Sequence, residues 1–321
     1  MKAILQHAYG SPEGLELREV DKPEIEDHQL LIRVHASSVN PAEWYRVMGP
    51  FFARFGNGVR RPKSPHIGAD LAGRVEAVGK DVKEFRPGDE VFGTSGASWA
   101  EYAAAREPRL VRKPANVSFE EAAAVPVAAL TALQAVRDHG RVQPGQKVLI
   151  NGASGGVGTY AVQLAKVFGG EVTGVCSTRN VELVDSLGAD RVCDYTQEDF
   201  TGANERYDVM LDIVGSRSFR RFKRVLKPEA TVVMVGAPMS SKGLGPLKHI
   251  IGTRVFSTGQ SQKVVNFLAK IEKDDLAFMS NLLETGKVRS IVDRRYELSE
   301  VADALRYLGT THARGKVVLT M

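Results

Sequence analysis

The chain is poor in cysteine, and this scarcity excludes two kinds of protein. Its 321 residues include only two cysteines, Cys176 and Cys193, which are too few for a disulfide framework or for a set of four thiolate ligands. A small secreted domain stapled by disulfides and a zinc finger are therefore excluded. The location that we expect is a reducing compartment, the cytoplasm.

Long apolar runs are also missing. The longest weakly polar stretch, residues 122–136, is interrupted by Pro126 and is shorter than the roughly 20 residues that a membrane helix needs. The first nine residues lack the basic and then apolar pattern of a signal peptide. We expect no membrane span.

Charge of either sign is not in strong excess. The net charge of +5 is mild and spread along the chain, so it predicts no nucleic-acid surface. The hydrophobic fraction of 43% and the charged fraction of 25% are typical of a globular protein. Because 321 residues exceed the usual size of one core, two domains are expected.

The order of the strand and helix patterns predicts an α/β fold with a divided first domain. In residues 1–121, short strand patterns are separated by Gly and Pro, as in a β-rich domain. In residues 122–259, strands alternate with helical stretches, which is typical of βαβ units around a parallel sheet. Residues 260–321 are expected to return to the first domain. The predicted strands are 30–35, 73–78, 90–93, 99–103, 148–151, 172–176, 191–194, 209–213, 231–235 and 316–319.

A glycine-rich turn follows the first strand of the second domain. Residues 151–158 read NGASGGVG, so that Ala153, Gly155 and Gly158 occupy the glycine positions of G-x-G-x-x-G. Gly155 would let the backbone approach a pyrophosphate, and Gly158 would let helix and strand pack closely. The amides of the following helix would meet the negative charge. The motif predicts a dinucleotide site, with Ser154, Gly156 and Val157 as further contacts.

No acidic residue stands where a site for NAD would need one. An Asp or Glu about 20 residues after the turn would hold the ribose hydroxyls of NAD, but residues 174–180 read GVCSTRN. Ser177 can donate a hydrogen bond, and Arg179 can offer a charge-assisted fork to the 2′-phosphate of NADP. NADPH is therefore the predicted cofactor. Further contacts expected here are Cys176, Asn180 and Tyr195, the last being alternatively a surface tyrosine.

Several motifs together resemble those of the medium-chain dehydrogenase/reductases, and more narrowly their quinone oxidoreductase branch. They are SSVNP at 37–41, GADLAG at 68–73, VG at 78–79, RPGDEV at 86–91, the turn at 151–158 and GK at 315–316. The resemblance covers almost the whole chain. It implies a GroES-like catalytic domain formed by the two chain ends, a Rossmann domain between them and an active site in the cleft that joins them. A homodimer, formed through the strand near residues 254–257, is expected by analogy.

The zinc ligands of the alcohol-dehydrogenase branch are missing. Those relatives hold a catalytic zinc with a cysteine where this chain has the segment around Asn40, and with a His-Glu pair in the segment that matches residues 68–70. The four-cysteine lobe of the structural zinc is missing as well. Asp70 and the scattered histidines do not have the spacing of a set of three or four ligands. We predict no metal.

Without a Lewis acid to stabilise an alkoxide, the acceptor should already be electrophilic. We expect hydride transfer from NADPH to a quinone or an α,β-unsaturated carbonyl, with hydrogen bonds to the phenolate or enolate. The resemblance places Asn40 beside the nicotinamide as donor, although a turn residue before Pro41 is the alternative. Tyr45 matches an active-site tyrosine of the branch or is a core aromatic. Asp70 either shapes the pocket or caps a loop.

The resemblance also implies cofactor contacts along the rest of the chain. Those on the nicotinamide side are Asn40, Thr131 and Phe256, those after the later strands are Val214 and Gly236, and those in the returning tail are Ala313 and Arg314.

Two other functions stay open. An enoyl-thioester reductase shares the fold and the lack of zinc, but in the family it uses a tyrosine where this chain has Phe51. A nonenzymatic role, as in crystallin relatives that serve for bulk or for RNA binding, is compatible with an intact NADPH pocket.

Overall fold

The computed structural model describes residues 1–202, 204–215, 219–236, 261–310 and 312–321. These residues form two compact units, Met1–Leu130 with Ile271–Met321, and Thr131–Lys270. The divisions fall later than the expected 121 and 259. The first division is later because residues up to Leu130 belong to the first unit, where the amide of Val127 donates to Asp70. The second division is later because a strand beyond residue 259 completes the sheet of the second unit.

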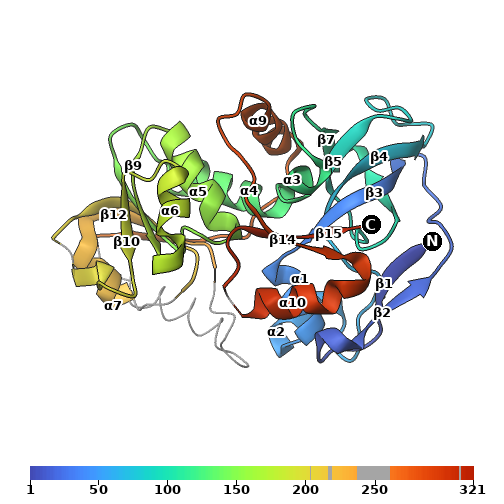
Figure 1. Cartoon of the computed structure of the whole chain (residues 1–321), viewed down its shortest axis with the longest axis horizontal. Helices are drawn as coiled ribbons and strands as arrows, with labels where there is room; N and C mark the ends of the chain where they lie inside the picture. Colours follow the sequence, from blue (N-terminus) through green and yellow to red (C-terminus); the bar gives the residue numbers. More distant parts are fainter. Residues whose placement is uncertain (203, 216–218, 237–260, 311) are drawn as a thin grey trace. The chain divides into compact units, whose positions relative to one another are not determined.

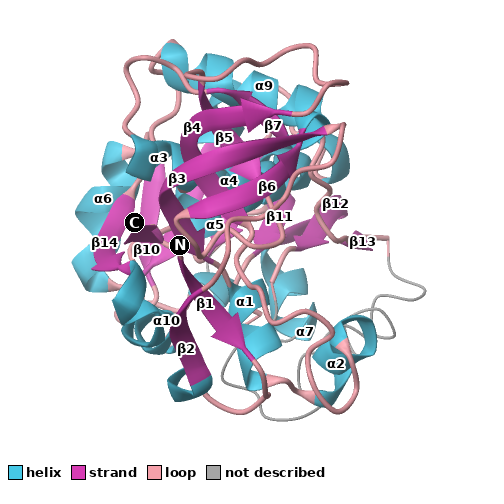
Figure 2. Ribbon diagram, turned by 90° about the vertical axis from the view of Figure 1, so that its right-hand side faces the viewer, coloured by secondary structure: helices cyan, strands magenta, loops and turns pink. Residues whose placement is uncertain are grey.

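The first unit contains a seven-stranded sheet and a two-stranded one. In the larger sheet the order is β14-β15-β3-β4-β5-β7, with β6 also paired to β3, and the smaller sheet pairs β1 with β2 (Figure 1). Figure 2 shows strands β3 to β7 as one twisted layer. The elements are β1 (Lys2–Gln6), β2 (Leu15–Glu19), β3 (Gln29–Val39), α1 (Pro41–Met48), α2 (Phe51–Asn57), β4 (Asp70–Val78), β5 (Glu90–Thr94), β6 (Tyr102–Arg106), β7 (Leu110–Arg112), α3 (Phe119–Ala123), α9 (Lys273–Glu284), β14 (Val292–Glu297), α10 (Val301–Gly309) and β15 (Lys316–Thr320).

The first half of the central strand β3 buries apolar side chains at alternate positions. Leu30, Ile32 and Val34 lie in the core, as the period of two in a strand requires. The second half of β3 pairs on one side with the returning β15 and on the other with β4. The tail of the chain thus contributes β15 to the sheet of the first unit.

One predicted strand is displaced along the chain. Residues 99–103 were expected to form it, but β6 begins at Tyr102. The reason is a change of partner: Ile4 donates to the carbonyl of Trp99, and Glu101 donates to that of Lys2. Residues 99–101 therefore follow β1, and only the following residues pair with β3.

The second unit is built around a six-stranded sheet that is parallel throughout, in the order β10-β9-β8-β11-β12-β13. Strand order reverses between β8 and β11, and ligands of such sheets bind outside the carboxyl ends of the strands at this switch point. The elements are α4 (Pro126–Leu133), which crosses the division and continues as a π-helical turn, β8 (Lys147–Asn151), α5 (Gly156–Val167), β9 (Glu171–Cys176), α6 (Val181–Ser186), β10 (Arg191–Asp194), β11 (Tyr207–Asp212), α7 (Phe219–Phe222), β12 (Leu226–Met234) and β13 (Lys263–Asn266).

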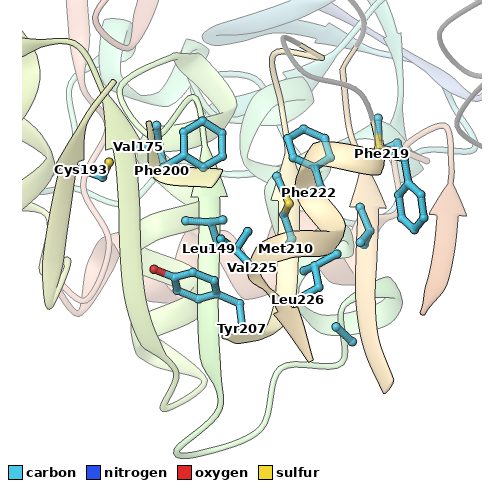
Figure 3. Close-up of a cluster of buried hydrophobic side chains, with 13 residues drawn as sticks. Leu149, Val175, Cys193, Phe200, Tyr207, Met210, Phe219, Phe222, Val225 and Leu226 are labelled. Carbon is cyan, nitrogen blue, oxygen red and sulfur yellow. The ribbon is translucent and has the colours of Figure 1, made fainter. Parts of the chain in front are cut away.

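A cluster of large side chains covers one part of this sheet (Figure 3). Leu149 and Met210, from neighbouring strands, pack with Phe222 of α7, and all three are fully buried. Truncating a buried aromatic such as Phe222 to Ala typically costs about 3–5 kcal/mol. This core holds the carboxyl ends of β8 and β11 in place. Among the described residues, no helix is both long and apolar enough to cross a bilayer.

Candidate active site

A buried polar cluster lies where three strands of the first unit meet. We call Ser38, Asn40, Asp70 and Lys316 the Asn40 cluster. Val317 pairs with Val39, and Leu71 pairs with Ser37, so the ends of β15, β3 and β4 bring the four side chains together. Each of the four is at most 4% exposed.

Hydrogen bonds join the members of the Asn40 cluster. Asp70 Oδ2 accepts from Ser38 Oγ at 2.6 Å and from Asn40 Nδ2 at 2.9 Å. Lys316 Nζ donates to Asn40 Oδ1 and lies 3.4 Å from Asp70 Oδ2. The other carboxylate oxygen of Asp70 accepts from the amide of Val127 at 2.9 Å. The buried charge of Asp70 is thus paired and hydrogen-bonded, as a buried charge must be.

Glu43 stands beside this cluster and was not among the predicted site residues. The amide of Asn40 donates to Glu43 Oε2 at 2.9 Å, which is half of a capping box at the start of α1. Burial, together with the negative charge of Asp70, raises the pKa of Glu43 to about 7, against the opposing effect of Lys316. The spacing Asn40-x-x-Glu43 was the sequence signal for this contact.

The three predicted catalytic residues are placed differently. Asn40 and Asp70 both belong to the Asn40 cluster. The hydrogen bonds given above for the Asp70 carboxylate all come from residues of the first unit. Tyr45 lies one turn into α1 and is half-buried, and burial raises the pKa of its phenol. Tyr45 therefore stays protonated near neutral pH and can act as a hydrogen-bond donor.

Gly315 allows the chain to turn so that Lys316 reaches the Asn40 cluster. Its φ is +99°, and a Cβ there would lie 2.3 Å from the carbonyl oxygen of Ile291. That carbonyl accepts from the amide of Lys316 at 2.8 Å. A side chain at 315 would push β15 away from its neighbours, so the Gly-Lys pair has a structural reason.

The glycine-rich turn has the geometry of a phosphate cradle. Gly152 makes the tight turn, with a φ of +91°, and Ala153 fills the position of the first motif glycine because Gly174 opposite has no side chain. A Cβ on Gly158 would lie 2.0 Å from the carbonyl oxygen of Gly152, whereas one on Gly155 would meet nothing closer than 3.6 Å. Gly155 thus leaves open space before the first turn of α5, whose amides lack intrahelical partners.

The end of β9 is tied to this turn by a buried asparagine. Asn180 Nδ2 donates to Ser154 Oγ and to Ser177 Oγ, both at 3.1 Å. Its Oδ1 is buried and has no partner among the described residues, which leaves an acceptor for a bound hydroxyl. Arg179 next to it is exposed. These residues, the open space at Gly155 and the amides of α5 fit a dinucleotide.

One carboxylate, that of Asp194, lies next to the end of β9 although it is outside residues 174–180. Asp194 at the end of β10 is the register partner of Cys176. Its side chain accepts from the amide and hydroxyl of Thr196 at 2.9 and 2.8 Å, and hydrogen bonds, first of all from Thr178, lower its pKa. Asp194 is thus engaged in its own turn.

The other predicted cofactor contacts are distributed over both units. Burial raises the pKa of Cys176 to about 11, so its thiol is not a nucleophile. Val214 packs over Gly152, Gly236 approaches the carbonyl of Ile213, and Tyr195 is 48% exposed. Thr131 is in the second unit and Ala313 and Arg314 are in the first; their cofactor contacts stay predictions. Phe256 and the dimer segment 254–257 lie outside the described residues.

Zinc does not fit the Asn40 cluster. The ammonium of Lys316 lies against the oxygens of Asn40 and Asp70 that a metal ion would need, and an ammonium supplies only donors. Within the described ranges, three or more His, Cys, Asp or Glu side chains are nowhere grouped as metal ligands. The absence of a metal from the protein stays a prediction.

Comparison with known proteins agrees with this arrangement. Residues 26–135 match the family model for the alcohol dehydrogenase GroES-like domain, and residues 187–319 match that for zinc-binding dehydrogenases. The chain is 34% identical to a chloroplast envelope quinone oxidoreductase homologue of Arabidopsis thaliana over 99% of this chain and 98% of that protein. It is also 34% identical to an NADPH-dependent alkenal/one oxidoreductase of the same plant, over 99% of this chain and 79% of that protein.

A solved structure extends the match to the whole fold. The quinone oxidoreductase of Coxiella burnetii superimposes with a TM-score of 0.87 at 32% identity, over 100% of this chain and 99% of that one. The expected pairing of a GroES-like and a Rossmann domain is thereby confirmed. The chain belongs to the medium-chain dehydrogenase/reductase family, in its quinone oxidoreductase branch.

Proposed function

We propose that the protein uses NADPH to reduce a quinone or an activated α,β-unsaturated carbonyl without a metal. The observation that carries this proposal is the Asn40 cluster. In it the ammonium of Lys316 lies against the oxygens of Asn40 and Asp70 that a metal ion would need, and Asn40 offers a hydrogen-bond donor. The relatives named as quinone and alkenal/one oxidoreductases support the choice of acceptor. The cytoplasmic location and a homodimer stay proposals.

NADPH, when bound, supplies a hydride to the electrophilic carbon of the acceptor. The turn at Gly155 and the first amides of α5 would hold its pyrophosphate. Asn180 Oδ1 would accept a ribose hydroxyl, and Arg179 would pair with the 2′-phosphate.

Residues of the first unit would stabilise the negative charge that develops on the acceptor oxygen. Within the described part of the chain, Asn40 Nδ2 makes one hydrogen bond, to Asp70, and its second N–H would donate to the enolate or phenolate oxygen. A fixed donor of this kind lowers the barrier because it needs no reorganisation as the charge forms. Tyr45, whose phenol stays protonated, would be a second donor or the source of the proton.

Consumption of NADPH with a panel of acceptors tests the proposal. The panel holds a 1,4-quinone, an enone, an enoyl thioester and, as control, the saturated ketone that matches the enone. We expect turnover with the quinone or the enone and none with the saturated ketone, because its carbonyl lacks a conjugated acceptor carbon. Turnover with the thioester alone would favour an enoyl-thioester reductase. NADPH binding without turnover on any acceptor would contradict an enzymatic role.

A further inference from the structure

Lys316 is a buried lysine that has no role in the reaction as proposed above. Its side chain is 4% exposed, and that of its partner Asp70 is fully buried. The ammonium has three donors and no acceptor, and it points them at Asn40 Oδ1, at the carbonyl of Val39 and at Asp70 Oδ2. Removing two such charges from water is costly, so the pair calls for a reason beyond stability.

The two charges together select one orientation of the Asn40 amide. The amide oxygen faces the ammonium of Lys316, and the amide nitrogen faces the carboxylate of Asp70. The flipped amide would set an NH2 group against the ammonium and an oxygen against the carboxylate, so both contacts would become repulsive. In the observed orientation the second Nδ2–H of Asn40 has a fixed direction.

We propose that Lys316 is a positioning residue for the reduction: with Asp70 it locks the Asn40 amide so that its second N–H is a preoriented donor for the acceptor oxygen. The inference rests on the proposed function. Preorganised donors stabilise developing charge far better than donors that must rotate into place. Lys316 thus acts through Asn40 and needs no contact with the acceptor.

Lys113 is a matched control in the same unit. Its side chain is 5% exposed and lies 3.1 Å from Glu90, so it is also a buried lysine paired with a carboxylate. It donates to the carbonyls of Pro114 and Val117 instead of to Asn40. Any effect that comes only from losing a buried ion pair should appear in both lysines.

The first measurement compares Lys316→Met with Lys113→Met. Both substitutions should lower the urea midpoint of unfolding, because each removes a buried ammonium from a carboxylate. Asp70 then loses its partner Lys316, whereas Glu90 keeps its ion pair with Arg74. We expect only Lys316→Met to lower kcat, by roughly 10- to 100-fold, while the Kd for NADPH stays within about twofold. Lys316→Arg, which keeps the cation, should recover part of kcat. A wild-type kcat in folded Lys316→Met, or an equal loss in Lys113→Met, would overturn the inference.

A double-mutant cycle separates action through Asn40 from a general effect on the fold. If Lys316 acts by orienting Asn40, the losses in kcat from Lys316→Met and Asn40→Ala should not multiply, and the double variant should resemble Asn40→Ala alone. Losses that multiply would overturn the inference even if each single variant is slow.

A readout without turnover keeps the inference testable if the proposed function fails. The side-chain amide signals of Asn40, identified by their absence in Asn40→Ala, should be sharp and resolved in the wild-type chain. They should broaden or shift toward free-amide values in Lys316→Met and stay unchanged in Lys113→Met. Unchanged signals in Lys316→Met would overturn the locking of the amide, whatever the acceptor panel shows.

Discussion

At the scale of single residues, Arg179 is the side chain that we expect to distinguish NADPH from NADH. It is exposed beside Ser177 at the end of β9, where a 2′-phosphate would meet it. Because charge-assisted hydrogen bonds contribute about 1.5–3 kcal/mol, Arg179→Ala should weaken NADPH by roughly 10- to 100-fold and NADH by less than about twofold. Titration of nicotinamide fluorescence measures both affinities.

The exposed Arg220 in the same unit is the control for net charge. Arg220→Ala removes one positive charge as well and should leave both affinities nearly unchanged. Equal weakening of NADPH and NADH by Arg179→Ala would remove the argument for cofactor choice from this residue.

Glu43 makes the stability of the first unit fall as the pH rises toward neutrality. Its pKa in the folded chain is about 7, above the ordinary 4.5, so the folded state holds a proton that the unfolded chain has lost. This contribution to stability is complete below about pH 4.5 and is lost as the pH rises through about 7. Relative to Glu43→Gln, the wild-type free energy of unfolding should therefore fall by roughly 2–3 kcal/mol between about pH 5 and about pH 8.

Urea unfolding of both chains at several pH values measures this difference. Glu43→Gln keeps an oxygen acceptor for the Asn40 amide, so the capping bond is matched. A difference that is flat over the whole range would show that the Glu43 carboxyl titrates normally.

At the scale of elements, two glycines at the start of α5 have different roles. A Cβ at 158 collides with the carbonyl oxygen of Gly152 at 2.0 Å, whereas a Cβ at 155 has room. We expect Gly158→Ala to destabilise the second unit by about 1–3 kcal/mol. Gly155→Ala should unfold like the wild type but bind NADPH more weakly, because its methyl group fills the space for the pyrophosphate.

Urea unfolding without cofactor and NADPH titration give the two readouts. A loss of stability in Gly155→Ala as large as that in Gly158→Ala would contradict the free space at residue 155. Wild-type affinity of Gly155→Ala for NADPH would show that the pyrophosphate does not lie against this residue.

The sequence predicted the elements well where one pattern decides the pairing. The buried runs at β8 and β9 and the alternation in β3 define strands by themselves. Residues 99–103 were misplaced because their alternation suits two partners, β1 and β3, and only the tertiary fold chooses between them. The Asn40 cluster could be predicted in part, since Asn40 and Asp70 stand in recognisable motifs. Lys316 could not, because its role depends on a strand register across 276 residues of chain.

At the scale of the whole molecule, the proposed reaction proceeds without zinc. Metal analysis of the purified chain should find far less than one equivalent of zinc, and dialysis against a chelator should leave kcat unchanged, because Lys316 lies where a metal would bind. Stoichiometric zinc together with loss of turnover after chelation would contradict the metal-free reaction.

Isotope transfer tests whether the hydride passes from NADPH to the activated acceptor. The wild-type chain is supplied with NADPH deuterated at its hydride-donating carbon and with an enone, and the product is analysed by mass spectrometry and NMR. We expect one deuterium on the former β-carbon, at a position that does not exchange with water. A reduced product without carbon-bound deuterium, or no product while NADPH is bound, would contradict it.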